Sequence, residues 1–179
     1  PMDPASPAAE KLGVMLDEGV KYVTGAQDPA AFWKETFGPD DVVAIKVSPV
    51  IPRELNFGPS TVAAVSARLE AAGVKPENIV LFDTSSRSLR KAGYELNEDG
   101  PGMRCIGTDM VGYSDRRTVH GSFEHFFSRV IEDSTAIINM PILKTHDLSG
   151  VSIALKNHYG SFDKPHLCHA NACDPYIAD

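Results

Sequence analysis

Nitrogen donors gather in one stretch of this chain, NMPILKTHDLSGVSIALKNHYGS, which runs from residue 139 to residue 161. It contains two lysines, two histidines and two asparagines: Lys144, Lys156, His146, His158, Asn139 and Asn157. Ammonium groups beside the free N–H groups of a helix start favour a carboxylate or phosphate ligand. Imidazole titrates near neutrality, which suits His146 to acid–base chemistry. We therefore predict a small-molecule anion here, with His146 and Lys144 as catalytic residues if the protein is an enzyme.

Polar residues also follow two other apolar runs. The run DVVAIKV carries Lys46 near its end and leads into Ser48, and the run ENIVLFDT carries Asp83 near its end. Ligands of open α/β sheets bind outside the carboxyl ends of the strands, so these side chains should share one edge with the first stretch. The predicted ligand-binding residues are Lys46, Ser48, Asp83, Asn139, Lys156 and Asn157. A second interpretation stays open for Asp83, because Asp also caps helices, and a short helix is expected just after it.

The tail HLCHANAC holds a different set of ligands, because imidazole and thiolate groups suit transition metals. We consider His146, His169, Cys173 and Asp174 as candidate ligands of a transition metal or of an iron–sulfur cluster. The spacing matches no standard zinc pattern, and a cluster usually needs more cysteines. The alternative is a polar loop with a buried cysteine that behaves as a small apolar side chain.

The composition narrows the classes of function. The chain has 179 residues and a formal net charge of −7, which argues against a nucleic-acid partner. No apolar run is long enough to span a bilayer, so we expect no transmembrane segment. The three cysteines are an odd count that fits no simple disulfide framework.

The order of elements must position these residues. Periodicity and breakers predict helices at 7–24, 29–37, 59–73, 85–93, 122–134 and 149–160, and strands at 41–47, 77–84, 103–109 and 135–140. Strand–helix–strand over 41–84 is a βαβ unit, with parallel strands expected. We predict an α/β fold, an open and mostly parallel sheet with helices on both faces in Rossmann-like layers. Residues 1–40 form an N-terminal helical segment that joins the α/β domain of residues 41–179 in one compact unit.

Several segments together resemble one known family. The segments are DDVVAIKV, LEAAGVKPENIVLFD, AIINMPILKTHDLSGVSIALKNHYG and HANACDPYIAD. They are similar to the domain of unknown function numbered 362 (DUF362), whose activity is not established. Relatives usually have Asn after the first strand, where this chain has Ser48.

This resemblance implies several expectations. It looks closest to an exported branch with a cleaved twin-arginine signal, and the start at Pro1-Met2 fits a processed or tagged chain. A periplasmic or extracellular location is then expected, with a cytoplasmic one as the alternative. Relatives fused to ferredoxin-type modules suggest a redox role. Relatives also continue further, so the chain would be the N-terminal part of the domain.

Three functional hypotheses follow. The first is an exported α/β protein that binds a small anion at the strand ends, as a binding protein or an enzyme. The second is a metal-linked or iron–sulfur-linked redox module that uses the His/Cys tail. The third is a homo-oligomer, or a partner-binding domain that another chain completes.

Overall fold

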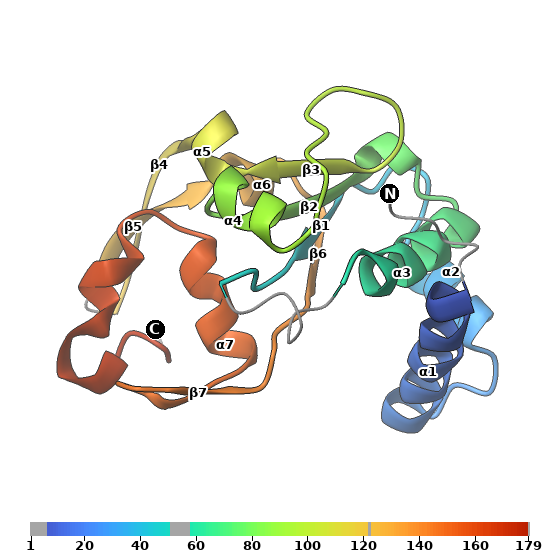
Figure 1. The fold of residues 1–179 in the computed structure, drawn as a ribbon, viewed down its shortest axis with the longest axis horizontal. Helices are drawn as coiled ribbons and strands as arrows, with labels where there is room; N and C mark the ends of the chain where they lie inside the picture. The colour runs from blue at the N-terminus through green and yellow to red at the C-terminus, as the bar shows by residue number, and fades with distance from the viewer. Residues whose placement is uncertain (1–6, 51–57, 122, 179) are drawn as a thin grey trace.

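A four-stranded parallel sheet forms the centre of the protein, in the strand order β3-β2-β1-β6. The computed structural model describes residues 7–50, 58–121 and 123–178 (Figure 1). The sheet strands are β1 (Val43–Lys46), β2 (Ile79–Asp83), β3 (Arg104–Gly107) and β6 (Ala136–Asn139). In the register, Lys46 at the end of β1 lies opposite both Phe82 and Asn139. The predicted α/β fold with a parallel sheet is confirmed, and the carboxyl ends of its strands share one edge.

Helices cover both faces of this sheet. On one face, Val43 and Ile45 pack in a core with α3 (Pro59–Ala72) and α4 (Ser86–Lys91). On the other face, Ala44 belongs to a smaller core with α5 (Thr108–Val111) and α6 (Arg129–Glu132). Each fully buried aliphatic side chain in these cores stabilises the fold by about 1.5–3 kcal/mol. The alternation along β1 therefore fixes the strand between two layers of helices.

Two helices from the first forty residues pack beside α3, at the right of Figure 1. They are α1 (Pro7–Thr24) and α2 (Pro29–Thr36). The Asp28 side chain accepts from the Ala30 N–H, and Pro29 occupies the first turn, where no N–H is needed. The predicted helices at 7–24 and 29–37 are confirmed. No helix in the described part of the chain is long and apolar enough to cross a membrane.

A β-hairpin replaces the helix predicted at 122–134, so that prediction is wrong. The strands β4 (Tyr113–His120) and β5 (Phe123–Ser128) pair antiparallel, and only α6 follows as helix. Phe123, His125 and Phe127 alternate along one face of β5, where consecutive rings lie 5.3 and 4.7 Å apart. Two of these rings also contact Phe162. The apolar residues do recur at helical spacing. The strand, however, lets the rings on one face of β5 pack against Phe162, which is distant in sequence.

A second hairpin and a late helix replace the predicted helix at 149–160. The strands β7 (Lys144–His146) and β8 (Gly150–Ser152) pair antiparallel, and α7 (Ala154–Asn157) follows them. Gly150 has φ +73°, which a right-handed helix cannot contain, so the prediction of a helix start there is wrong. Short 3-10 helices complete the fold at Pro76–Asn78, His158–Gly160 and Pro165–Cys173.

Candidate functional site

A cavity of about 650 Å³ lies at the carboxyl ends of β1 and β2, between the β7–β8 hairpin, α7 and the 3-10 segment that follows. We call it the strand-end cavity. Its polar and charged lining residues are Lys46, Ser48, Asp83, Thr84, Lys144, Thr145, His146, Asp147, Ser152, Lys156, Asn157, Tyr159 and His169. All the predicted catalytic and ligand-binding residues line it except Asn139, which binds Asn157. The structure therefore brings the predicted residues together, while their roles stay predictions.

A buried ion pair forms the floor of the strand-end cavity. Lys46 Nζ donates to Asp83 Oδ1 at 2.6 Å, and it also contacts the Val47 carbonyl at 2.6 Å and Asn157 Oδ1 at 3.4 Å. Burial lowers the pKa of the Lys46 ammonium, and the Asp83 carboxylate partly offsets this shift. An ammonium has three N–H donors, so these contacts use them all. The capping role considered for Asp83 is wrong, because Ser85 caps α4.

The lack of a side chain at Gly160 leaves space for this ion pair. A Cβ placed on Gly160 would lie against Asp83 Oδ1 and within 2.8 Å of Lys46 Nζ. The Gly160 carbonyl also accepts from Thr84 Oγ1 at 3.3 Å, which holds this backbone against the end of β2. From the sequence, Gly160 read only as the residue that closes a helix. Gly160 and Asp83 are far apart in the sequence, so no local pattern indicates that they lie together.

Two asparagines fasten α7 to the strand ends. Asn157 Nδ2 donates to Asn139 Oδ1 at 2.7 Å and to the Lys46 carbonyl at 3.2 Å. Asn139 Nδ2 donates in turn to the Ala154 carbonyl at 2.9 Å. These bonds link β1, β6 and α7 in one network. Both side-chain amides therefore support the wall and floor of the cavity.

Two other lysines, Lys144 and Lys156, line the strand-end cavity and contact groups other than carboxylates. Lys144 Nζ donates to Ser48 Oγ at 3.0 Å, and Lys156 Nζ lies 3.1 Å from His169 Nε2. Lys156 Nζ also lies 3.5 Å from the centre of the Tyr159 ring. Burial is the main cause that lowers the pKa of both lysines. Among described residues, no carboxylate lies within ion-pair distance of either ammonium.

Two stacked imidazoles stand beside Lys156. The His146 and His169 rings lie 5.6 Å apart and 24° from parallel. His146 Nδ1 accepts from the Leu148 and Ser149 N–H groups at 3.3 and 3.2 Å. Burial lowers the pKa of His146, and Lys156 lowers it further. The amides expected to bind an anion at a helix start are thus partly used within the β7–β8 turn.

A comparison with protein families shows to which family the chain is related. The model described as "Domain of unknown function (DUF362)" matches residues 43–177. The chain belongs to the DUF362 family. The match covers the sheet and the whole strand-end cavity, from β1 onward. No curated protein and no solved structure matches the chain. Export through a twin-arginine signal, and a place at the N-terminal end of a longer domain, stay predictions.

The candidate metal ligands of this DUF362 protein are not gathered into a site. Within the described ranges, no group of three or more His, Cys, Asp or Glu side chains could hold a metal ion. Cys173 is buried in an apolar cluster with Tyr159 and Cys168, and Asp174 is exposed. His169 Nε2 faces the Lys156 ammonium, where a metal ion would meet a positive charge. The residues present do not fit a transition metal or an iron–sulfur cluster.

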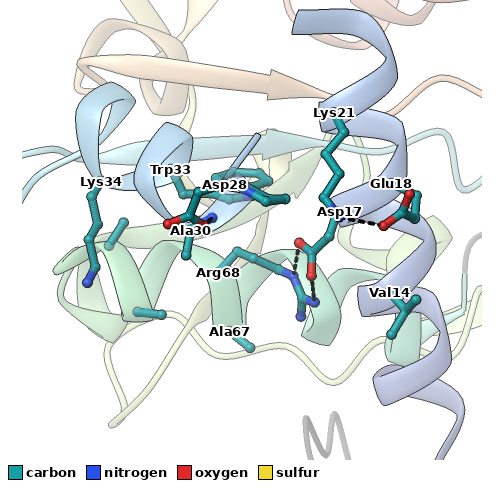
Figure 2. A pocket seen from close by; sticks show the side chains of 13 residues that line it. Val14, Asp17, Glu18, Lys21, Asp28, Ala30, Trp33, Lys34, Ala67 and Arg68 are labelled. Atoms are coloured by element: carbon teal, nitrogen blue, oxygen red, sulfur yellow. Dashed lines mark hydrogen bonds and ion pairs between the residues drawn. The ribbon is translucent and has the colours of Figure 1, made fainter. Parts of the chain in front are cut away.

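The DUF362 protein has a second cavity, of about 580 Å³, between α1, α2 and α3 (Figure 2). We call it the helical cavity. Its Arg68 guanidinium forms two bonds with the Asp17 carboxylate, at 3.0 and 2.7 Å, and Lys21 pairs with Glu18 at 2.7 Å. Trp33 closes one wall (Figure 2). Nothing in the sequence pattern predicted this cavity, because it depends on how three helices pack.

Proposed function

We propose that this DUF362 protein binds a small anion with a carboxylate or phosphate group in the strand-end cavity. The observation that carries the proposal is the pair of cationic side chains, Lys144 and Lys156, in a cavity where no described carboxylate pairs with them. Taking a charge out of water is costly unless an opposite charge compensates it. Among described residues, no carboxylate lies within ion-pair distance of either ammonium, although the Asp83 carboxylate raises the pKa of Lys144 from a greater distance. An anion between the two ammonium groups would supply a direct partner.

The other lining groups support an anion over a cation. Ser48 and Ser152 add hydroxyl groups, and His146 adds an imidazole. The Asp83 carboxylate is paired with Lys46 on the floor, so its charge is largely neutralised towards the cavity. Asp147 lines the cavity too, but its side chain is exposed to solvent, where screening weakens it. The balance of charge that a ligand meets is positive.

The test is a thermal-shift measurement with inorganic phosphate, acetate, oxalate and citrate. We expect at least one of these anions to raise the Tm of the parent protein. Lys144→Ala and Lys156→Ala should each weaken binding about tenfold, which corresponds to about 1.4 kcal/mol. Lys34→Ala is the matched control, because it removes an exposed lysine from the helical cavity.

Two outcomes would overturn the proposal. One is that no anion of the panel stabilises the parent protein. The other is that Lys34→Ala weakens binding as much as Lys144→Ala does, because the effect would then come from net charge. Isothermal titration at two ionic strengths separates a site from general attraction, since surface electrostatics are screened by salt.

A second candidate function is association with another copy of the chain. β6, like β3, is an outer strand of the described sheet, so one of its edges lacks a strand neighbour there. Apolar side chains are exposed on β6, just after it and on α7: Ile137 is 43% exposed, Leu143 73% and Leu155 64%. Sedimentation of the parent protein and of Leu155→Ser tests this. A parent protein that stays monomeric at high concentration contradicts it.

A further inference from the structure

We infer that His146 serves the strand-end cavity as a neutral hydrogen-bond donor, whose Nε2–H binds an oxygen of the anion. This inference rests on the proposed function and gives His146 a different role from the acid–base role predicted from the sequence. It identifies the residue that selects the ligand by its hydrogen-bonding character. It also defines the ligand class as an oxyanion that presents ionised acceptor oxygens to these donors.

The β7–β8 turn decides where the proton of His146 lies. Its Nδ1 faces two backbone N–H groups, those of Leu148 and Ser149, at 3.3 and 3.2 Å. An N–H group only donates, so Nδ1 must present its lone pair to both. A neutral imidazole carries one N–H, which places it on Nε2. The hairpin register holds this arrangement, because His146 pairs with Gly150 across the turn.

The surroundings of His146 oppose a second proton on the ring. A proton on Nδ1 would point at the two amide hydrogens and remove both bonds. The charged or titratable groups acting on the ring are Lys144 on the same strand, Asp147 in the turn, Lys156 on α7 and His169 on the 3-10 segment. Only Asp147 favours the imidazolium form, whereas burial, the two lysines and His169 lower the pKa. The ring is therefore neutral at physiological pH.

His169 is fixed in the opposite tautomer. Its Nδ1 lies 3.0 Å from the Pro165 carbonyl oxygen, which only accepts, so Nδ1 carries the hydrogen. Its Nε2 then accepts from Lys156 Nζ at 3.1 Å. Lys156 is thus oriented by a neutral group that leaves its charge uncompensated. The stacked pair sets up one donor, His146, and positions another, Lys156.

This arrangement has a consequence for ligand choice. Lys144, Lys156 and His146 all act as donors, and none of them can accept from a ligand in these protonation states. A carboxylate, or the ionised oxygens of a phosphate group, satisfies them. An amide or a protonated acid can offer its carbonyl oxygen to one donor, but its own N–H or O–H has no partner among these three groups. Such a mismatch is one that enzymes and binding proteins use for rejection.

The first measurement is NMR of the protein labelled with ¹⁵N-histidine. The His146 signals are assigned by their loss in His146→Asn. We expect the ¹⁵N pattern of an Nε2–H tautomer in the neutral ring, and a pKa below that of an unperturbed His. An Nδ1–H pattern, or titration near the ordinary pKa, would overturn the inference.

The second measurement compares two substitutions, with oxalate and inorganic phosphate as the probes. His146→Asn keeps an acceptor for the turn amides, as Asn does in local turns, but has no distal N–H. His146→Gln keeps a distal N–H and loses the turn acceptor. We expect His146→Asn to weaken binding about tenfold to a hundredfold, as the loss of a bond to a charged group does, and His146→Gln to stay within about threefold of the parent.

The outcomes separate this inference from the proposed function. If a probe binds the parent protein and His146→Asn equally, the donor role of His146 is contradicted, whereas the anion site is supported. If His146→Gln loses binding while His146→Asn keeps it, the turn acceptor matters and the donor role falls as well. If neither probe binds the parent protein, the donor role and the anion site that it needs fall together.

Discussion

The strand-end cavity and the helical cavity have similar volumes, but their positively charged side chains have different partners. In the helical cavity, of about 580 Å³, Arg68 is paired with Asp17 and Lys21 with Glu18 (Figure 2). In the strand-end cavity, of about 650 Å³, Lys144 and Lys156 contact a hydroxyl group, an imidazole and an aromatic ring. The difference teaches that volume does not identify a ligand site here. The feature that separates the proposed anion site from the helical cavity is its two partly buried lysines, which have no carboxylate within ion-pair distance among described residues.

The ion pairs of the two cavities also differ in burial. The Arg68 and Asp17 side chains are 23% and 32% exposed, whereas those of Lys46 and Asp83 are 1% and 6% exposed. Exposed pairs gain little, because water and salt screen them. A buried pair is held by mutual compensation, and either partner alone is strongly destabilising. The comparison can be tested by changing matched residues in the two cavities.

The largest effect is expected for Asp83→Ala. It leaves the buried Lys46 ammonium without its carboxylate, and the free energy of unfolding should fall by about 3–5 kcal/mol. Chemical denaturation measures this, with Asp17→Ala as the counterpart in the helical cavity, where the loss should be about 0.2–1 kcal/mol. The double variant Lys46→Met with Asp83→Ala should recover part of the loss. Equal losses for Asp83→Ala and Asp17→Ala would contradict the difference in burial.

Alanine at two glycine positions should change the free energy of unfolding in opposite directions, and by less than Asp83→Ala does. Gly160→Ala places a methyl group against Asp83 and Lys46, so the free energy of unfolding should fall by about 1–3 kcal/mol. Gly19→Ala lies on the exposed side of α1 with open space around it and should stabilise the protein by about 0.5–1 kcal/mol. Denaturant titration of both variants checks this. A Gly160→Ala protein as stable as the parent would show that the floor can shift without cost.

The Arg68–Asp17 pair should give a smaller coupling. A double-mutant cycle with Arg68→Ala and Asp17→Ala should report an interaction of about 0.2–1 kcal/mol, because both side chains are partly exposed. The coupling should shrink as salt is raised from about 0.05 M to about 1 M. A salt-independent coupling of several kcal/mol would mean that the helical cavity behaves like the buried floor of the other one.

The pH dependence of stability should distinguish the partly buried Lys144 and Lys156 from the exposed Lys34. Burial lowers the pKa of Lys144 and Lys156 in the folded protein, so the unfolded chain binds more protons as the pH approaches 10.5. The resulting destabilisation is complete below the folded pKa and is relieved as pH rises through it. The stability of the parent relative to Lys144→Met should therefore rise from about pH 7 to about pH 10. Denaturation at low salt without added anions measures this, and Lys34→Met should show no such trend.

Local sequence patterns predicted the strands of the parallel sheet correctly, but they predicted helices where the two hairpins lie. The strand at 41–47 was predictable because a short β-branched run between breakers can be buried on both faces. The spacing of Phe123, Phe127 and Val130 fits a helix as well as it fits β5. The choice depended on Phe162, which packs on the aromatic face from far along the chain. At Gly150 the positive φ belongs to a turn that helical periodicity does not reveal.

The sequence by itself determined that Lys46, Asp83, Asn139 and Lys144 would approach one another. Each follows or ends a predicted strand, and parallel strands bring their carboxyl ends to one edge. Only the tertiary structure decided which of these charges remain available. Lys46 is neutralised by Asp83, whereas Lys144 is not paired with a carboxylate among described residues. The physical reason is that strand order follows from local composition, but compensation of charge depends on side-chain contacts between distant elements, which no local pattern encodes.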